Sequence, residues 1–335
     1  MTRLSTAAIE HAIGLEGLFV LRLRDGEVRL HGADGETVRV AEEDGSDLEE
    51  TFAVERGEGS LSLGTGRGLR IKLGRGRHAS PHLDVAVPRR ATVVVEAGSA
   101  DLSAEDLAGD QRYETVSGDV NLTRVRGQVE IDAVSGDVKL SAGGELRLRA
   151  RTVSGDVQAR AGRLTGLLLA TTSGDLSLAG ELDPDGQHRI ETVSGDTLLA
   201  LAGGARVELS SVTGDLRSEV AHRSEGSRNR RVVILGDGRA TLTASSMSGD
   251  IRIVRARPLE TVSEDGPAAE PPPDPAARPP ATTGEASDAA IGAAYEAARL
   301  GILKRLERGE IDVAEAGRRL EALDAADVPG SSIHG

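Results

Sequence analysis

Residues 115–120 read Thr-Val-Ser-Gly-Asp-Val, and the same six residues recur at positions 152–157. The Ser-Gly-Asp triplet in this stretch occurs six times in the chain, and a Thr-Gly-Asp version occurs once. Successive copies start 18, 19, 19, 21, 19 and 35 residues apart, and a degenerate copy, Ser99-Ala100-Asp101, starts 18 residues before the first. The chain therefore holds eight related units. The intact triplets are Ser117-Gly118-Asp119, Ser135-Gly136-Asp137, Ser154-Gly155-Asp156, Ser173-Gly174-Asp175, Ser194-Gly195-Asp196, Thr213-Gly214-Asp215 and Ser248-Gly249-Asp250.

The residues on either side of each triplet alternate in polarity. Positions six, four and two before the triplet are apolar or small, as in Val129, Ile131 and Ala133. Positions three and five beyond its first residue are mostly apolar, as in Val138 and Leu140. A period of two is typical of a strand with one buried face. Each unit is thus predicted to hold two short strands joined by a turn at the triplet.

A unit of about 19 residues cannot bury its apolar face alone, whereas stacked copies bury their faces together. We therefore expect a mainly β fold, a β-solenoid of about eight rungs in which each strand pairs in parallel with its equivalent in the next rung. The interior is predicted to be narrow and lined by Val, Leu, Ile and Ala. Phe19, Phe52, Tyr113 and Tyr295 are the only aromatic residues of the chain, and we expect that rings do not fit inside.

Two interpretations of the triplet follow from its residue types. Gly permits a positive φ, and the Asp and Ser side chains accept hydrogen bonds from nearby backbone N–H groups, so the triplet suits a tight structural turn. In the second interpretation, the column of carboxylates from Asp119 to Asp250 binds divalent cations, as stacked acidic turns do in calcium-binding β-rolls. Those rolls have a nine-residue unit that is richer in Gly and Asp. We favour the structural turn.

The composition excludes several classes of protein. The chain has no Cys, and its seven His residues show no metal-ligand spacing, so we expect no metal and no cofactor. No run approaches the roughly 20 apolar residues of a membrane span, and residues 1–18 lack an apolar stretch of signal-peptide length, which predicts a cytoplasmic location. The net charge of −14 argues against nucleic-acid binding, because phosphate affinity depends on clustered Lys and Arg.

Residues 1–90 are predicted to form a β-rich cap that closes a solenoid over residues 91–257. Asp25-Gly26 lies between two alternating runs, which is a strong hairpin signal, and an uncapped solenoid end would expose unpaired strand edges. Within the cap, residues 64–90 carry seven Lys or Arg against one acid, Asp84. A patch for anions or a membrane surface is one interpretation, and a solvated face is the one we favour.

The spacing of 35 residues between Thr213 and Ser248 predicts one rung plus an insertion. The polar residues 218–231 form this insertion. Insertions in solenoids emerge as loops on one face and often carry binding sites, although a solvated loop is the interpretation we favour. The basic residues of this stretch are Arg223, Arg228, Arg230 and Arg231.

Beyond the repeats, the composition changes abruptly. Residues 258–284 are rich in Pro and predict a disordered linker. Residues 285–325 predict a two-helix hairpin with an apolar side on each helix and a break at Gly309. A hairpin of this size is too small to be stable alone, so it is expected to dock on a protein partner, on a second copy or on the solenoid, and we favour the partner. The candidate contact residues are Ile302, Leu306, Ile311 and Leu320.

The Ser-Gly-Asp repeats, preceded by strand residues 84–87 and Pro88, resemble the bacterial β-strand-repeat domain of unknown function often labelled "putative adhesin". The resemblance covers roughly residues 20–255. The tail, with Gly309-Glu310-Ile311-Asp312 and Glu315-Ala316, resembles the short SHOCT-like helical module found with such domains. The resemblance implies a non-enzymatic protein without catalytic residues. Relatives with both parts are associated with bacterial envelope-stress response, as in Lia-type systems.

Three hypotheses of function follow. The leading one is a cytoplasmic scaffold or regulatory protein without a small-molecule substrate, whose solenoid binds a protein partner while the tethered helices add a second contact. The second is a solenoid that assembles with itself into filaments, which a capped end disfavours. The third is a carbohydrate-active enzyme on a β-helix, which the absence of converging carboxylates and of sugar-stacking aromatic residues disfavours.

Overall fold

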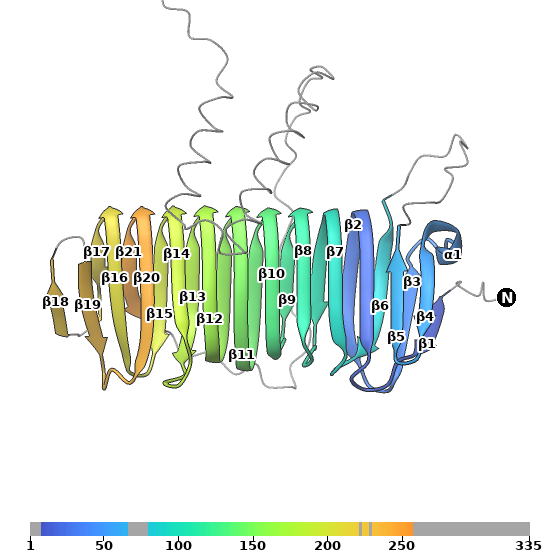
Figure 1. The fold of residues 1–335 in the computed structure, drawn as a ribbon, viewed down its shortest axis with the longest axis horizontal. Helices are drawn as coiled ribbons and strands as arrows, with labels where there is room; N and C mark the ends of the chain where they lie inside the picture. Colours follow the sequence, from blue (N-terminus) through green and yellow to red (C-terminus); the bar gives the residue numbers. More distant parts are fainter. Residues whose placement is uncertain (1–7, 66–79, 221–222, 228–229, 257–335) are drawn as a thin grey trace, which may run out of the picture. The chain divides into compact units, whose positions relative to one another are not determined.

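Strands form most of the part of the chain that the computed structural model describes, which is residues 8–65, 80–220, 223–227 and 230–256. These residues lie in Met1–Leu259, the first of the two units into which the chain divides. Their strands stack rung upon rung along one axis (Figure 1), which confirms the mainly β solenoid. The predicted linker at 258–284 and helical hairpin at 285–325 lie outside the described residues. No described helix is long and apolar enough to span a membrane.

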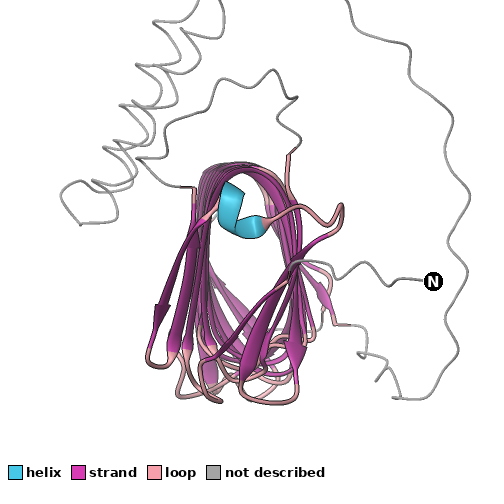
Figure 2. Ribbon diagram, turned by 90° about the vertical axis from the view of Figure 1, so that its right-hand side faces the viewer, coloured by secondary structure: helices cyan, strands magenta, loops and turns pink. Residues whose placement is uncertain are grey.

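Two walls of strands meet at one edge and enclose the core (Figure 2). The parallel strands of the ascending wall run toward the Ser-Gly-Asp triplets, and those of the descending wall run away from them; β4, β19 and β3 run opposite to their walls. In spatial order, the ascending wall contains β4 (Ala53–Gly57), β5 (Ser60–Gly64), the first halves of β2 (Leu18–Ala33) and β7 (Thr92–Glu105), β8 (Gln111–Ser117), β10 (Gly127–Ser135), the second halves of β11 (Val138–Ser154) and β12 (Val157–Ser173), β14 (His188–Ser194), β20 (Ala240–Ser248), β16 (Ala205–Thr213), β19 (Arg230–Leu235) and β18 (Arg223–Gly226). The descending wall contains β1 (Ile9–Ala12), β3 (Thr37–Glu42), β6 (His82–Pro88), the other halves of β2 and β7, β9 (Val120–Thr123), the first halves of β11 and β12, β13 (Leu176–Leu182), β15 (Thr197–Ala202), β21 (Ile251–Arg255) and β17 (Leu216–Ser218).

The repeats pair in parallel with each triplet directly over the next. Ser135 lies opposite Ser154, which lies opposite Ser173 on the following rung. Val129 and Ile131, predicted to face inward, are fully buried. The predicted alternation of buried and exposed residues is therefore confirmed on these strands, and it places one continuous apolar core between the walls.

The glycine of the triplet is required by close backbone contact between rungs. The seven triplet glycines have φ between +122° and +153°. A Cβ added to Gly155 would lie 2.1 Å from the carbonyl oxygen of Gly136, and one on Gly174 would lie 2.2 Å from that of Gly155. Both the backbone conformation and the spacing therefore exclude a side chain at this position.

The hairpin predicted at Asp25-Gly26 is wrong. These residues lie inside one strand, β2, which pairs in parallel with β7 and places Gly26 opposite Ala100 of the degenerate triplet. Gly26 has φ +126°, as the triplet glycines do. Asp25-Gly26 is therefore a further solenoid corner, and the parallel stack begins within the segment predicted as a cap. The Asp-Gly pair predicted a hairpin because a hairpin turn and a solenoid corner both need a residue with positive φ.

The order of the last two rungs differs from the order of the sequence. Ser194 lies opposite Ser248, and Ser248 lies opposite Thr213, so β20 is inserted between β14 and β16. On the other wall, β21 lies between β15 and β17 in the same way. The predicted sequential stack is therefore wrong at this end. Strands that share one repeat pattern offer the same pairing surface, and their order is set by the connections.

Part of the stretch predicted as an inserted loop forms strands instead, in Arg223–Gly226 and at the start of Arg230–Leu235. β18 and β19 pair antiparallel with each other, and β19 pairs antiparallel with β16. This hairpin closes the end of the ascending wall. A guanidinium nitrogen of Arg231 donates a hydrogen bond to the carbonyl of Leu216 (2.6 Å). The hairpin therefore covers an edge that would otherwise be unpaired.

The opposite end is closed by antiparallel strands and a short helix. β1 pairs with β3, β3 with β6, and β4 with β5. The helix α1 (Leu48–Thr51) lies across the mouth between the walls (Figure 2). Asp47 caps this helix by accepting a hydrogen bond from the N–H of Glu49 (3.0 Å). Closed ends on the described unit disfavour growth into filaments.

The expectation that rings do not fit inside is wrong for this end of the solenoid. Phe19 and Tyr113 are fully buried, and Phe52, which follows α1, is 2% exposed. The hydroxyl of Tyr113 donates a hydrogen bond to Oε1 of Gln111 (3.2 Å), and burial raises the pKa of its phenol. The rings cluster near the closed end, whereas small aliphatic residues fill the central rungs. Tyr295 lies outside the described residues.

Replacing a stacked glycine is expected to destabilise the whole solenoid. Gly155→Ala should lower the free energy of unfolding by ~3–5 kcal/mol, because it combines a strained φ with a backbone clash. Gly143→Ala is the matched control, since a Cβ there meets no atom within 4 Å, and it should change stability by less than ~0.5 kcal/mol. Guanidinium titration measures both. Equal effects would refute the stacking argument.

The rung order can be tested with engineered disulfides, because the chain has no cysteine. Ser194→Cys with Ser248→Cys should form a disulfide on oxidation, since neighbouring rungs are about 4.8 Å apart. Ser194→Cys with Thr213→Cys should not, because these positions are two rungs apart, at about 10 Å. Peptide mapping without reductant detects the bond. If only the Ser194→Cys/Thr213→Cys pair formed a disulfide, the rungs would be stacked in the order of the sequence, and the order described above would be wrong.

Candidate functional site

The seven predicted turn triplets form a single column along the edge where the walls meet. In six of the seven triplets, all but that of Asp215 at the end of the column, the Asp carboxylate accepts a hydrogen bond from the backbone N–H of the Asp on the next rung. Oδ1 of Asp137 accepts from Asp156 (3.0 Å), and Oδ1 of Asp156 accepts from Asp175 (2.8 Å). The ladder continues across the rearranged end, where Oδ1 of Asp250 accepts from Asp215 (2.8 Å). The side chains thereby connect consecutive rungs.

This geometry gives the carboxylates a structural task. Each rung contributes one Asp, and its Oδ1 is already engaged by the neighbouring rung. Within the described ranges, no group of three or more His, Cys, Asp or Glu residues is arranged to hold a metal ion. Hard cations such as calcium take six to eight oxygen ligands. The other predicted site, formed by Ile302, Leu306, Ile311 and Leu320, lies outside the described residues.

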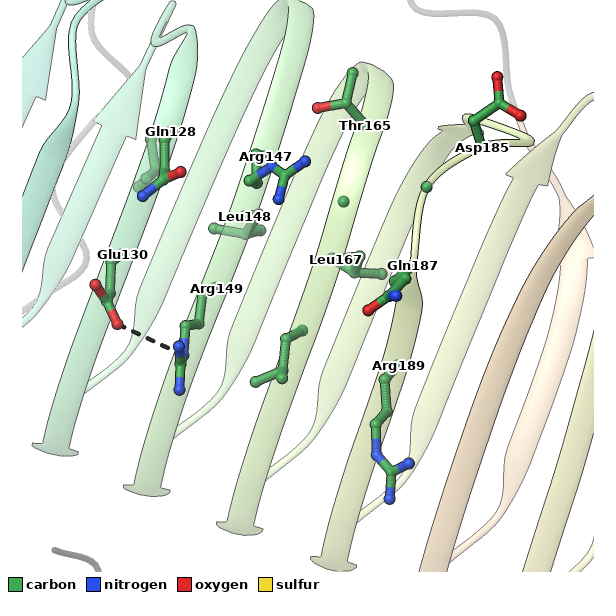
Figure 3. Close-up of a pocket in the computed structure, with 14 residues that line it drawn as sticks. Gln128, Glu130, Arg147, Leu148, Arg149, Thr165, Leu167, Asp185, Gln187 and Arg189 are labelled. Atoms are coloured by element: carbon green, nitrogen blue, oxygen red, sulfur yellow. Dashed lines mark ion pairs between the residues drawn. The ribbon is translucent and has the colours of Figure 1, made fainter. Parts of the chain in front are cut away.

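A groove that the sequence did not predict lies on the outer face of the ascending wall (Figure 3). We call it the arginine groove, and its volume is about 600 Å³. It crosses β10, β11, β12 and the approach to β14. Its lining residues are Gln128, Val129, Glu130, Arg147, Leu148, Arg149, Thr165, Gly166, Leu167, Leu168, Asp185, Gly186, Gln187 and Arg189.

The floor of the arginine groove is low because β12 carries short outward residues. Gly166 and Leu168 occupy the positions seven and five before Ser173. The neighbouring strand β11 places Arg147 opposite Gly166 and Arg149 opposite Leu168. A Cβ on Gly166 would lie 3.4 Å from Cγ and 3.6 Å from Cζ of Arg147, so the arginine side chain packs over this buried glycine.

A bulge positions this floor. Leu146 pairs with Leu164, but the next pair is Arg147 with Gly166, which leaves Thr165 as an extra residue in β12. The hydroxyl of Thr165 donates a hydrogen bond to the carbonyl of Leu146 (3.3 Å). The bulge thereby fixes which residues of β12 face outward.

A turn at residues 183–186 forms one rim of the arginine groove. The N–H of Asp185 (2.9 Å) and Nε of Arg163 (2.9 Å) both donate to the carboxylate of Asp183. These two contacts, the backbone one first, hold the pKa of Asp183 below its ordinary value. The buried ring of His188 bonds to the carbonyl of Asp183 through Nε2 (2.8 Å). The rim is therefore fixed by a carboxylate that stays ionised at neutral pH.

The charge of the arginine groove is mainly positive. Nε of Arg149 lies 3.5 Å from the carboxylate of Glu130, which is also 3.3 Å from Arg112. Arg189 hydrogen-bonds to Glu191 (2.6 Å). Arg147 has no ion pair or hydrogen bond to any residue that the structure describes, and its side chain is exposed. In a chain of net charge −14, this is a local surplus of cations over a partly apolar floor.

The sequence carried a signal for this groove in its outward columns. Aligned on the triplets, the column five residues before the triplet includes Arg149, Leu168 and Arg189 on consecutive rungs. The half-buried Leu168 therefore stands between two arginines on an outward row. Only the inward columns were used to predict the fold, so this signal was missed.

Replacement of an Asp of the ladder separates its structural role from a cation role. Asp156→Ala should destabilise the protein by ~1–3 kcal/mol, because the N–H of Asp175 loses its acceptor. Asp156→Asn keeps an oxygen at that place and should cost less. Thermal unfolding in excess calcium and in EDTA should give equal Tm values. A Tm that rises with calcium in the wild type but not in the Asn variant would establish cation binding instead.

Comparison with known proteins gives a family and a set of similar folds. The sequence model of the Toastrack DUF4097 family matches residues 27–254. No curated protein matches the chain. A "putative lipid binding protein" from Parabacteroides distasonis is 12% identical with a TM-score of 0.33, and the match covers 74% of this chain and 96% of that one. A "putative adhesin" from Bacteroides fragilis is 9% identical with a TM-score of 0.27, covering 74% and 96%. A "putative cell adhesion protein" from Clostridium sporogenes is 9% identical with a TM-score of 0.23, covering 73% and 97%. Likeness at this level carries no argument about a ligand.

Proposed function

We propose that this chain, which belongs to the Toastrack DUF4097 family, is a non-enzymatic binding protein whose solenoid contacts a protein partner through the arginine groove. The observation that carries the proposal is the exposed Arg147, which pairs with no residue that the structure describes, near the half-buried, outward-facing Leu168. Interfaces are enriched in arginine and combine charge with apolar contact. A wall that only faces solvent has no structural requirement for a groove or for an apolar side chain on its outer face, whereas a binding surface does.

The rigidity of the scaffold supports a binding role. The strands below the arginine groove are held by parallel pairing on both sides, and the nearby edge is fixed by the glycine and Asp columns. A surface that is already ordered loses little conformational entropy when a partner binds. The groove residues also stand on strands, which position side chains more accurately than loops do.

The groups that line the arginine groove support a non-enzymatic role. They are guanidinium, amide, aliphatic and hydroxyl groups with two carboxylates, those of Glu130 and Asp185. The carboxylate of Glu130 is engaged by Arg112 and Arg149. The lining holds no nucleophile paired with a base.

The remaining parts of the proposal rest on the sequence. The predicted hairpin at 285–325, which resembles a SHOCT-like module, would provide a second contact or self-association through a tether. A cytoplasmic location is part of this proposal. A role in bacterial envelope stress follows from the resemblance alone.

A photocrosslinking experiment tests whether a partner contacts the arginine groove. A benzophenone amino acid is placed at Leu168 on the groove floor or at Leu198, an outward leucine of the descending wall that is 38% exposed. Irradiation of the full chain in its native lysate should give discrete protein adducts from position 168 and none from position 198. Excess wild-type chain should compete, whereas excess Arg147→Glu/Arg189→Glu chain should not. The same adducts from both positions, or none from 168, would reject the groove as the contact.

A further inference from the structure

We infer that the arginine groove recognises an extended peptide segment that carries an acidic residue and an apolar residue two positions apart. This inference rests on the proposed function and names the chemistry of the partner. The groove floor lies along β12, and its outward residues Gly166, Leu168 and Ala170 follow one another at every second position. Outward side chains on a strand are about 6.6–6.8 Å apart, which is also the spacing on one face of an extended peptide.

The first of these positions suits a carboxylate. Gly166 has no side chain and is buried, and the exposed Arg147 packs over it, with Cζ of its guanidinium 3.6 Å from the place where a Cβ of Gly166 would lie. Arg147 has no partner among the described residues. A guanidinium presents several N–H donors in one plane and binds carboxylates in a bidentate manner. An acidic side chain that reaches the guanidinium of Arg147, where it lies over Gly166, would therefore form an ion pair without breaking one among the described residues.

The next position suits an apolar side chain. Leu168 is half-buried between Arg149 on β11 and Arg189 on β14. The two arginines lie one rung to either side of Leu168, so their stems flank it and extend its apolar surface. A side chain two residues along the peptide from the acidic one would lie on this leucine. The ligand therefore carries a Glu-x-Leu type of motif on one face.

The edges of the groove supply groups for the peptide backbone. Gln128 and Gln187 line the groove on either side of Thr165 and Leu167 (Figure 3), and each amide offers donors and an acceptor. The three arginines are distributed over two strands and two rows instead of converging on one point. This spread fits charges arranged along a chain better than a single phosphate group. The geometry therefore favours a peptide over a lipid headgroup.

Three labelled nonapeptides test the inference by fluorescence anisotropy with the full chain. The first, Ser-Gly-Ser-Glu-Thr-Leu-Ser-Gly-Ser, places Glu and Leu on one face of an extended peptide. The second, Ser-Gly-Ser-Glu-Leu-Thr-Ser-Gly-Ser, has the same composition but places them on opposite faces. The third replaces Glu by Gln in the first. The first should bind about tenfold more tightly than either control, since hydrogen bonds to charged groups are the strong ones.

Variants of the protein locate the binding. Arg147→Ser should weaken binding of the first peptide about tenfold, whereas Lys139→Ser, an exposed cation on the descending wall, should leave it unchanged. Equal binding of the three peptides, or binding that ignores Arg147→Ser, would overturn the inference. The inference would also be overturned if anionic phosphatidylserine vesicles displaced the labelled first peptide while the unlabelled first peptide did not. If the crosslink from position 168 persists in these cases, the proposed function stands and only the peptide chemistry is rejected.

Discussion

The close approach of the backbone at the Ser-Gly-Asp edge is the constraint on which the rest of the structure depends. Where a Cβ of Gly155 would lie, the carbonyl of Gly136 is only 2.1 Å away. Only glycine fits both this distance and the positive φ, so the triplet recurs on rung after rung. The Asp side chain of each of these rungs then accepts a hydrogen bond from the backbone N–H of the Asp on the next rung, and the strands leave the edge in the same register. The two walls, their inward aliphatic rows and the outward groove all follow from that common register.

The inward and outward faces serve different purposes because the register is shared. Inside, like residues stack on like residues, and the central rungs need no ring to fill the space between the walls. On the outer face, equivalent residues of consecutive rungs lie side by side, so the order of the rungs alone decides which side chains are neighbours. A change from arginine to Gly166 or Leu168 in one rung is therefore enough to make a hollow there. The solenoid can acquire a binding surface on one rung without altering its core.

The repeated features of the fold could be predicted from the sequence, whereas the ends of the solenoid, the order of its last rungs and the groove could not. The triplets and the inward positions of Val129 and Ile131 were recognisable, because their spacing reflects a local rule that every rung obeys. The corner at Gly26 was taken for a hairpin, because a positive φ marks both kinds of turn. The sequence order placed the rung of Thr213 before the rung of Ser248, whereas the structure stacks them in the reverse order. Equivalent rungs can pair in either order, and the connection through β18 and β19 decides between the two. The arginine groove depends on neighbours that come from three separate rungs, which a linear pattern does not place side by side until the stacking is known.

The insertion of β20 and β21 also determines when the fold can be completed during synthesis. A simple solenoid can add each rung to the previous one as the chain leaves the ribosome. Here β16 and β17 emerge before the strands that join them to the rest of the stack, since β16 has no pairing with β14 and β17 has none with β15. They must wait for residues 240–255 to arrive and fill the gap. The C-terminal end of the solenoid is therefore completed only after the last of its strands has been translated, and a chain that stops before residue 240 lacks the rung that connects its end to its body.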